Sequence, residues 1–290
     1  MNLLSLEPFR KTISLASGRI SYVDTDPSSN SPPLFFVHGL GTNLLLWRNS
    51  IELLRSHQRC IAIDLPLHGQ SPGALDQNLT LSGLAIIVEE VCDLLDLSLI
   101  DLVGNDLGGA ICQTFAVSRP DFVRSLILTN CDVHSNLPPD AFQETVALAR
   151  QGQLWARAKP LLANVNLMRH HSEISKGYEH PETLSEELLR AYLEPVLGTQ
   201  ERTRVFEKYL RSVCKEDLMA LESKLGQFHA PVLLVWGLED VFFSIKWAYW
   251  LQQTFPPKCD LVKIEGAKLF FVDERAEEFA QHVIRFIGIL

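Results

Sequence analysis

A glycine-rich segment at residues 104–109 has the composition of a catalytic turn. Gly104-Asn105-Asp106-Leu107-Gly108-Gly109 follows an apolar run and precedes a helical pattern. Glycines on both sides of a central residue allow a sharp strand-to-helix turn where neighbouring backbone leaves no room for a Cβ. The turn lifts Asp106, whose carboxylate suits nucleophilic attack on carbon or proton transfer. Phosphate binding is disfavoured because GxGxxG is absent and no basic residue is near.

Short apolar runs and amphipathic stretches alternate on both sides of this turn. Runs that are apolar on both faces predict a mostly parallel sheet covered by helices on both faces. The predicted strands are 19–24, 34–37, 60–64, 99–103, 125–129, 232–236 and 260–264. The predicted helices between them are 44–55, 81–95, 110–118, 244–254 and 274–289.

The strand rhythm stops after Asn130 and resumes near Pro231. The intervening chain is too long for a loop and contains only helical patterns, so it predicts an inserted helical cap. The expected cap helices are 140–151, 153–169, 185–196, 201–213 and 215–225. We therefore predict an α/β core formed by residues 1–132 and 231–290, and a cap formed by residues 133–230.

The charge balance and the cysteines limit the partners. With 26 basic and 35 acidic residues, the formal net charge is -9, which disfavours a nucleic-acid partner. The six cysteines form no CxxC pair, so we expect small buried residues in a reducing compartment, not disulfides or a metal site. We expect a small-molecule substrate, no metal and no cofactor, and either a monomer or a homodimer.

The sequence also predicts where the protein works. The start lacks the basic and long apolar regions of a secretory signal. The most apolar long stretch, 79–103, is interrupted by acidic residues and does not suit a membrane span. We therefore expect a cytoplasmic protein with no membrane contact. The interrupting residues are Glu89, Glu90, Asp93 and Asp96.

The motifs taken together resemble the α/β-hydrolase superfamily over nearly the whole chain. They are the loop His38-Gly39-Leu40-Gly41, the segment 64–71, the elbow at 104–109 and the segment 236–240. An elbow aspartate and a cap after the sixth strand resemble the haloalkane dehalogenase and epoxide hydrolase branch in particular. The resemblance implies an eight-stranded α/β-hydrolase sheet.

The resemblance also implies roles for individual residues. Asp106 would attack carbon to give an alkyl-enzyme ester, and Asp240 would be the acid that orients a histidine base. The backbone N–H groups of Leu40 and Leu107 would stabilise the oxyanion when water hydrolyses the ester. The loop from His38 to Trp47 resembles the dehalogenase oxyanion segment, in which His38, like His68 in the next loop, would support the backbone. Asp132 lies where some members of the branch carry their acid.

The chain departs from this pattern at the base. Leu269 occupies the position at which the family carries histidine, and leucine cannot accept a proton. Lys268 is the alternative if the alignment shifts by one residue, but it would need a strongly lowered pKa. His134, near the start of the cap, is the candidate for a relocated base, with Asp132 to orient it.

The substrate-binding donors also differ. Dehalogenases hold the leaving halide with side-chain N–H groups at the positions of Leu40 and Leu107, so dehalogenation is disfavoured. Epoxide opening needs acidic hydroxyls, and the cap supplies three tyrosines for that role, Tyr178, Tyr192 and Tyr209.

Three functions follow from these residues. One is a hydrolase of a small apolar ester, epoxide or related substrate that uses Asp106. Another is a lyase, isomerase or cyclase in which Asp106, its pKa raised by apolar surroundings, acts as a general acid and base. The third is a ligand-binding protein without activity.

Overall fold

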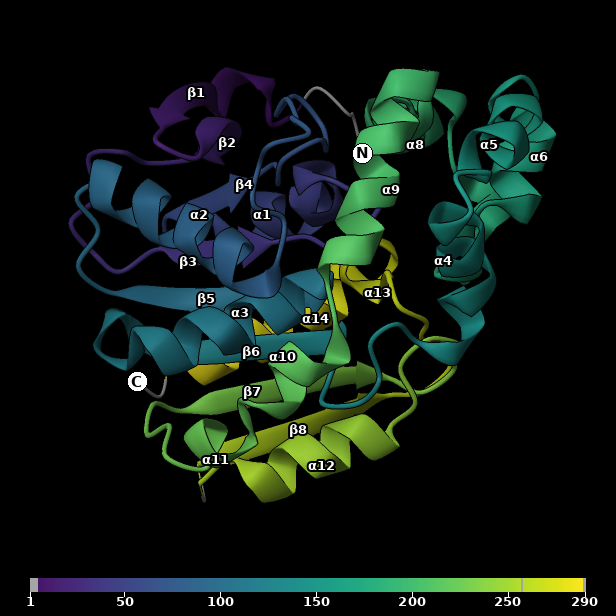
Figure 1. The fold of residues 1–290 in the computed structure, drawn as a ribbon. Coiled ribbons are helices and arrows are strands. Elements are labelled where there is room, and N and C mark those ends of the chain that lie inside the picture. Colours follow the sequence, from purple (N-terminus) through teal and green to yellow (C-terminus); the bar gives the residue numbers. More distant parts are fainter. Residues whose placement is uncertain (1–4, 257, 289–290) are drawn as a thin grey trace.

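An eight-stranded sheet forms the centre of the computed structural model, which describes residues 5–256 and 258–288 (Figure 1). The strand order is β1-β2-β4-β3-β5-β6-β7-β8. β2 runs antiparallel to β1 and β4, and the remaining neighbours are parallel. The predicted α/β-hydrolase sheet is therefore confirmed. The strands are β1 Arg10–Leu15, β2 Gly18–Asp24, β3 Leu34–Val37, β4 Cys60–Ile63, β5 Ile100–Asp106, β6 Val123–Cys131, β7 Val232–Gly237 and β8 Cys259–Ile264.

Two features of the strands differ from the sequence prediction. β1 was not among the expected strands, because it is an edge strand whose residues are half-buried or exposed and carry no continuous apolar run. β5 and β6 extend beyond their predicted ends, and Asp106 pairs with Cys131 in the ladder. The longer strands bring the elbow and the start of the cap side by side.

Helices cover both faces of the sheet. α2 packs with α3, and α1 packs with α14. Figure 1 shows α2 and α3 in front of the sheet and α14 behind it. The predicted helix over 44–55 is a 3-10 turn, Leu44–Trp47, followed by α1, and the predicted end of the last helix at Ile289 lies outside the described residues. These helices are α1 Arg48–Leu54, α2 Leu81–Leu94, α3 Leu107–Ser118, α12 Lys246–Thr254, α13 Phe271–Glu274 and α14 Ala276–Ile287.

The segment between β6 and β7 is helical; its helices α4 to α9 lie beyond the carboxyl ends of the parallel strands, whereas α10 and α11 lie in front of the sheet, where α11 contacts α3 (Figure 1). The helix expected over 153–169 is divided in two, because the Asn164 side chain accepts backbone N–H groups and starts a new helix. The exact boundaries between core and cap, at residues 132/133 and 230/231, stay a prediction. These helices are α4 Gln143–Arg150, α5 Leu154–Leu162, α6 Val165–His171, α7 Glu173–Lys176, α8 Glu186–Leu197, α9 Gln200–Ser212, α10 Lys215–Met219 and α11 Glu222–Leu225.

No helix in the described ranges has the length and hydrophobicity of a membrane span. Five of the cysteines are buried and Cys214 is half-buried, and all are free thiols.

Candidate active site

Asp106 sits on a strained turn between β5 and α3. Its backbone has φ 57° and ψ -132°, a conformation that non-glycine residues rarely adopt and that is typical of a nucleophile elbow. Gly108 in the elbow and Gly39 in the loop after β3 leave room for this turn. A Cβ on Gly39 would lie 2.2 Å from the Cβ of Asp106, and one on Gly108 would lie 2.2 Å from the Val37 carbonyl oxygen. The glycines are therefore required by close approach of neighbouring chain.

Backbone amides hold the Asp106 carboxylate. Oδ1 accepts a hydrogen bond from the Leu107 N–H, and the Leu40 N–H also donates to the carboxylate. Burial raises the pKa of Asp106 to about 7, the Leu107 and Leu40 amides oppose that rise, and the negative charge of Asp240 adds to it. Asp106 therefore holds a proton more readily than an ordinary aspartate, and its carboxylate is oriented by two fixed donors.

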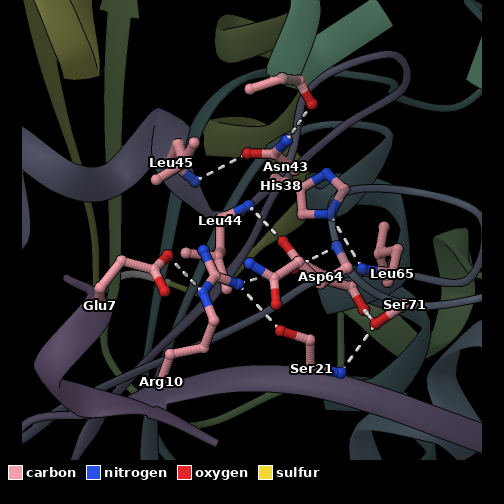
Figure 2. A network of polar contacts seen from close by, with 12 residues as sticks. Glu7, Arg10, Ser21, His38, Asn43, Leu44, Leu45, Asp64, Leu65 and Ser71 are labelled. Atoms are coloured by element: carbon pink, nitrogen blue, oxygen red, sulfur yellow. Dashed lines mark hydrogen bonds and ion pairs between the residues drawn. The ribbon is translucent and has the colours of Figure 1, made fainter. Parts of the chain in front are cut away.

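The loop that carries Leu40 is held by a buried polar network (Figure 2). Asp64 accepts hydrogen bonds from the Leu44 N–H at 3.0 Å and from Arg10 at 3.1 Å. The Asn43 side chain donates to the Ala191 carbonyl of α8 at 2.8 Å and so connects this loop to the cap. The network fixes the N–H of Leu40 relative to the elbow.

The histidines of the two adjoining loops have structural roles. His38 Nε2 accepts from the Leu65 N–H at 2.9 Å, and His68 Nε2 accepts from the Gly41 N–H at 3.1 Å. Their Nδ1 atoms lie near carbonyl oxygens, so each ring is a neutral Nδ1–H tautomer. Burial lowers the pKa of His68 to about 4 and that of His38 well below its usual value. Neither histidine lines the cavity described below.

A cavity lies above the elbow, between the core and the cap, with about 580 Å³ of empty space, part of which is open to solvent. Asp106, Asp132 and Glu173 are its only charged lining side chains among the described residues, and the other lining residues are apolar. No histidine, lysine or arginine among these residues reaches the wall. The apolar residues nearest in sequence to the predicted site are Leu40, Leu137, Phe242, Phe243, Leu269 and Phe270.

Asp132 follows β6 and is almost completely buried, with 1% of its surface exposed. Its backbone N–H donates to the Asp106 carbonyl at 3.4 Å. Its Oδ1 is buried and has no hydrogen-bond partner. Burial first, and then the charges of Asp106 and Asp240, raise the pKa of Asp132 well above its usual value. Asp132 therefore holds a proton more readily than an ordinary aspartate does.

Asp240 faces a different partner from the one expected. Its Oδ2 accepts from Asn130 Nδ2 at 2.8 Å, and its Oδ1 accepts from the Phe242 N–H at 2.9 Å. Burial raises the pKa of Asp240 to about 6, while these hydrogen bonds and the charge of Lys268 oppose the rise. Asp240 does not line the cavity. Its carboxylate orients Asn130 and the loop after β7, with no histidine between it and Asp106.

The residue at the family's histidine position lies in the cavity wall. Leu269 is 2% exposed and lines the same cavity as Asp106. The Leu269 carbonyl accepts from Asn105 Nδ2 at 3.1 Å, and the next N–H, of Phe270, donates to the Gly177 carbonyl of the cap at 2.9 Å. An apolar side chain therefore takes the place where the family's base would act.

The structure does not place His134 at this cavity. Its ring packs on Trp250 at 4.8 Å between centroids, and its Nε2 lies 3.5 Å from Glu222. His134 is absent from the residues that line the cavity, because a left-handed backbone with φ 50° leads its side chain toward α12. The geometry does not support His134 as the replacement base.

Trp47 also lies elsewhere than expected. It is fully buried between Phe36 and Phe279, at centroid distances of 5.1 and 6.1 Å, and does not line the cavity. Trp47 therefore belongs to the core and not to the substrate site.

The cap tyrosines are buried but do not line the cavity. The Tyr178 hydroxyl donates to Asp273 at 3.0 Å and lies 3.4 Å from the Tyr192 hydroxyl. Arg48 pairs with Asp273 at 2.8 Å, so this cluster is a polar seam between core and cap. Tyr209 packs edge-on against His68, and its hydroxyl has no partner.

A second cavity adjoins the first within the cap, with about 630 Å³ of empty space, part of which is open to solvent. The two share Leu40, Phe142, Glu173 and Ile174 in their walls. Apolar side chains of α5, α8 and α9 form much of the second wall, which also includes Arg157 and His171. Sequence reasoning did not identify Glu173 or Asn130, because a single acidic residue on a cap helix and an asparagine at a strand end carry no recognisable motif.

Comparisons with known proteins agree with this architecture. Residues 32–276 match the family described as alpha/beta hydrolase fold, and the chain belongs to this family. It is 29% identical over 280 residues to haloalkane dehalogenase 2 of Mycobacterium tuberculosis, covering 93% of this chain and 92% of that protein. It is 26% identical over 278 residues to a 2-hydroxy-6-oxononadienedioate/2-hydroxy-6-oxononatrienedioate hydrolase of Burkholderia vietnamiensis, covering 93% and 91%.

A solved structure extends the comparison of folds. The epoxide hydrolase CorEH superposes with a TM-score of 0.78 over 96% of this chain and 98% of that one, at 20% identity. Family membership and the hydrolases among its relatives support a hydrolase. No group of three or more His, Cys, Asp or Glu side chains in the described part of the chain is arranged to hold a metal ion.

Proposed function

We propose that this protein hydrolyses a small apolar epoxide or ester, with Asp106 as the nucleophile. One observation carries the proposal: a carboxylate held by the Leu40 and Leu107 amides lies on a strained elbow at an otherwise mainly apolar cavity. A desolvated carboxylate is a stronger nucleophile than a hydrated one, and a covered site keeps bulk water from competing.

The two amides suit both steps of such a reaction. In the first step they hold one carboxylate oxygen while the other attacks a substrate carbon. In the second step water attacks the carbonyl carbon of the resulting ester, or of the mixed anhydride that an ester substrate gives when its alcohol leaves, and the same donors stabilise the oxyanion that forms. The network around Asp64 supports this use, because it fixes the Leu40 loop before substrate arrives.

The residues that line the two cavities limit the class of substrate. Leu40 and Leu107 offer no side-chain donor for a leaving halide, so we place haloalkanes behind epoxides and esters. The second cavity gives an apolar substituent a place away from the reacting carbon. An uncharged substrate is favoured, since no cationic side chain among the described lining residues of the first cavity would balance an anion.

Intact-mass spectrometry tests the proposal with a panel of apolar probes, styrene oxide and p-nitrophenyl butyrate among them. The wild type is expected to form either a covalent adduct or the hydrolysis product with at least one probe. The isosteric variant Asp106→Asn is expected to form neither, because an amide is a poor nucleophile. Turnover that survives in Asp106→Asn would contradict the proposal.

A second candidate is acid–base chemistry without a covalent intermediate, as in a lyase, isomerase or cyclase. The raised pKa of Asp106, about 7, favours it, because efficient proton transfer needs a pKa near the working pH. This alternative predicts exchange of solvent deuterium into a carbonyl ligand, lost in Asp106→Asn, with no adduct for any probe. A protein that only binds ligand would keep its affinity in Asp106→Asn.

A further inference from the structure

We propose that Asp132 replaces the missing histidine, by sharing one proton with Asp106 and acting first as the acid and then as the base of the hydrolysis. The inference rests on the proposed function of Asp106. It names Asp132 as the second catalytic residue, which touches the opening substrate oxygen and the attacking water.

The position of Asp132 carries the proposal. Asp132 lines the same cavity as Asp106, and the two residues are joined by the backbone hydrogen bond at the end of the β5–β6 ladder. Its side chain is almost completely buried, yet Oδ1 has no partner. A buried carboxyl oxygen without a partner is costly, and such cost is typical of functional positions.

No other described carboxyl group offers the same chemistry at the elbow. Glu173, across the cavity on α7, already accepts from Thr145 at 2.8 Å and pairs with Lys176 at 2.7 Å. Asp240 is held by Asn130 outside the cavity wall. The charged groups that act on Asp132 are the carboxylates of Asp106 and Asp240, and no cation offsets them. Two such carboxylates cannot both ionise readily, so the pair holds one proton near neutral pH.

The reaction of an epoxide balances with this single proton. An Asp106 carboxylate oxygen bonds to a ring carbon, the ring C–O bond breaks, and the opening oxygen takes the proton of Asp132. The product is a hydroxyalkyl ester of Asp106 beside an ionised Asp132. The pair has passed its negative charge from one residue to the other.

Hydrolysis returns the pair to its starting state. The Asp132 carboxylate takes a proton from water, and the hydroxide oxygen bonds to the ester carbonyl carbon, whose oxygen is held by the Leu40 and Leu107 amides. The ester C–O bond then breaks, and the leaving alkoxide takes the proton from Asp132 to complete the diol. Asp106 is left protonated, and transfer of that proton to Asp132 closes the cycle.

The variant Asp132→Asn removes both roles, because an amide can donate a hydrogen bond to the opening oxygen but can neither give it a proton nor take one from water. With styrene oxide as the probe, Asp132→Asn is expected to form the covalent ester on Asp106 more slowly than the wild type and then to retain it. Decay of that ester should be at least about 100-fold slower than in the wild type, the scale of general base catalysis. His134→Gln is the matched control, since it removes the rival base, and is expected to behave as the wild type.

The outcomes separate the two proposals. Diol formation at the wild-type rate in Asp132→Asn, or ester accumulation in His134→Gln, would overturn the role of Asp132. An absence of both ester and diol in the wild type would count against the proposed function itself.

A measurement without substrate tests the proton sharing in either case. Carboxyl 13C NMR of the wild type should show Asp132 protonated through neutral pH. In Asp106→Asn the pKa of Asp132 should fall, because the neighbouring negative charge is gone. If the pKa of Asp132 is the same in Asp106→Asn as in the wild type, the inference is overturned, whatever the activity. A thermal unfolding transition like that of the wild type would show that Asp106→Asn and Asp132→Asn are folded.

Discussion

Leu269 lies in the wall of the same cavity as Asp106, and its carbonyl accepts a hydrogen bond from the side chain of Asn105, the residue that precedes the nucleophile. The loop after β8 is therefore anchored to the elbow although it carries no base. The apolar side chain of Leu269 helps to exclude water from the cavity. Burial of this kind raises the pKa of Asp106, and proton transfer is left to the carboxyl groups nearby.

Restoring histidine at this loop should bring back the base. In the Asp132→Asn background, Leu269→His is expected to accelerate decay of the Asp106 ester at least about 10-fold, followed by intact mass after styrene oxide is removed. Burial of an imidazole should cost about 1–3 kcal/mol in the free energy of unfolding, measured with urea. Leu269→Met, which stays apolar, is the control, and equal decay in both variants would show that position 269 does not face the ester.

The close approach of Gly39 to the nucleophile predicts a sharp steric effect. Gly39→Ala would place a methyl group 2.2 Å from the Cβ of Asp106, so the elbow must shift. We expect loss of adduct formation and about 1–3 kcal/mol of destabilisation. Gly226→Ala, where the nearest atom is 3.6 Å away, should change stability by less than about 1 kcal/mol. Normal activity in Gly39→Ala would contradict the geometry of the elbow.

The raised pKa of Asp106 predicts a pH-dependent cost to stability. The folded protein holds this proton up to about pH 7, whereas the usual pKa of aspartate is 3.8. The folded state therefore binds more protons in that window, and the contribution of Asp106 to stability falls as pH rises through it. Asp106→Asn has no titrating group at this position. The free energy of unfolding of the variant should therefore rise relative to that of the wild type by a few kcal/mol between about pH 4 and pH 8. Urea unfolding of both proteins across this range measures it, and parallel curves would mean that Asp106 has an ordinary pKa.

Tyr209 should be dispensable for the reaction. Its hydroxyl is buried without a partner, and the residue does not line the cavity. Tyr209→Phe is expected to keep styrene oxide turnover within about twofold and to be neutral or slightly stabilising, because an unsatisfied hydroxyl is removed. Loss of turnover with unchanged thermal unfolding would instead identify Tyr209 as the proton donor for ring opening.

Much of the fold was predictable because its signals are local. The apolar runs of the inner strands and the glycines around Asp106 each act within a few residues. β1 was not predicted, because an edge strand with half-buried residues lacks that pattern.

The site was less predictable because its partners are distant in sequence. Asp132 could be placed near the elbow by strand order, but its unpartnered oxygen depends on the absence of any donor in three dimensions. His134 was a reasonable candidate by position alone, and only the left-handed backbone there shows that its ring turns to Trp250. The sequence alone shows leucine at the position where the family carries histidine. The chemical consequence became clear only from the residues that line the cavity.

The central claim is that Asp106 forms a covalent ester, and isotope labelling tests it most directly. Wild-type protein in excess over styrene oxide is allowed one turnover in H2 18O, and the peptide that contains Asp106 is then analysed by mass spectrometry. Because water attacks the ester carbonyl carbon, the account predicts 18O in the Asp106 carboxyl group and an unlabelled first diol. Label found only in the diol, with Asp106 unlabelled, would contradict it.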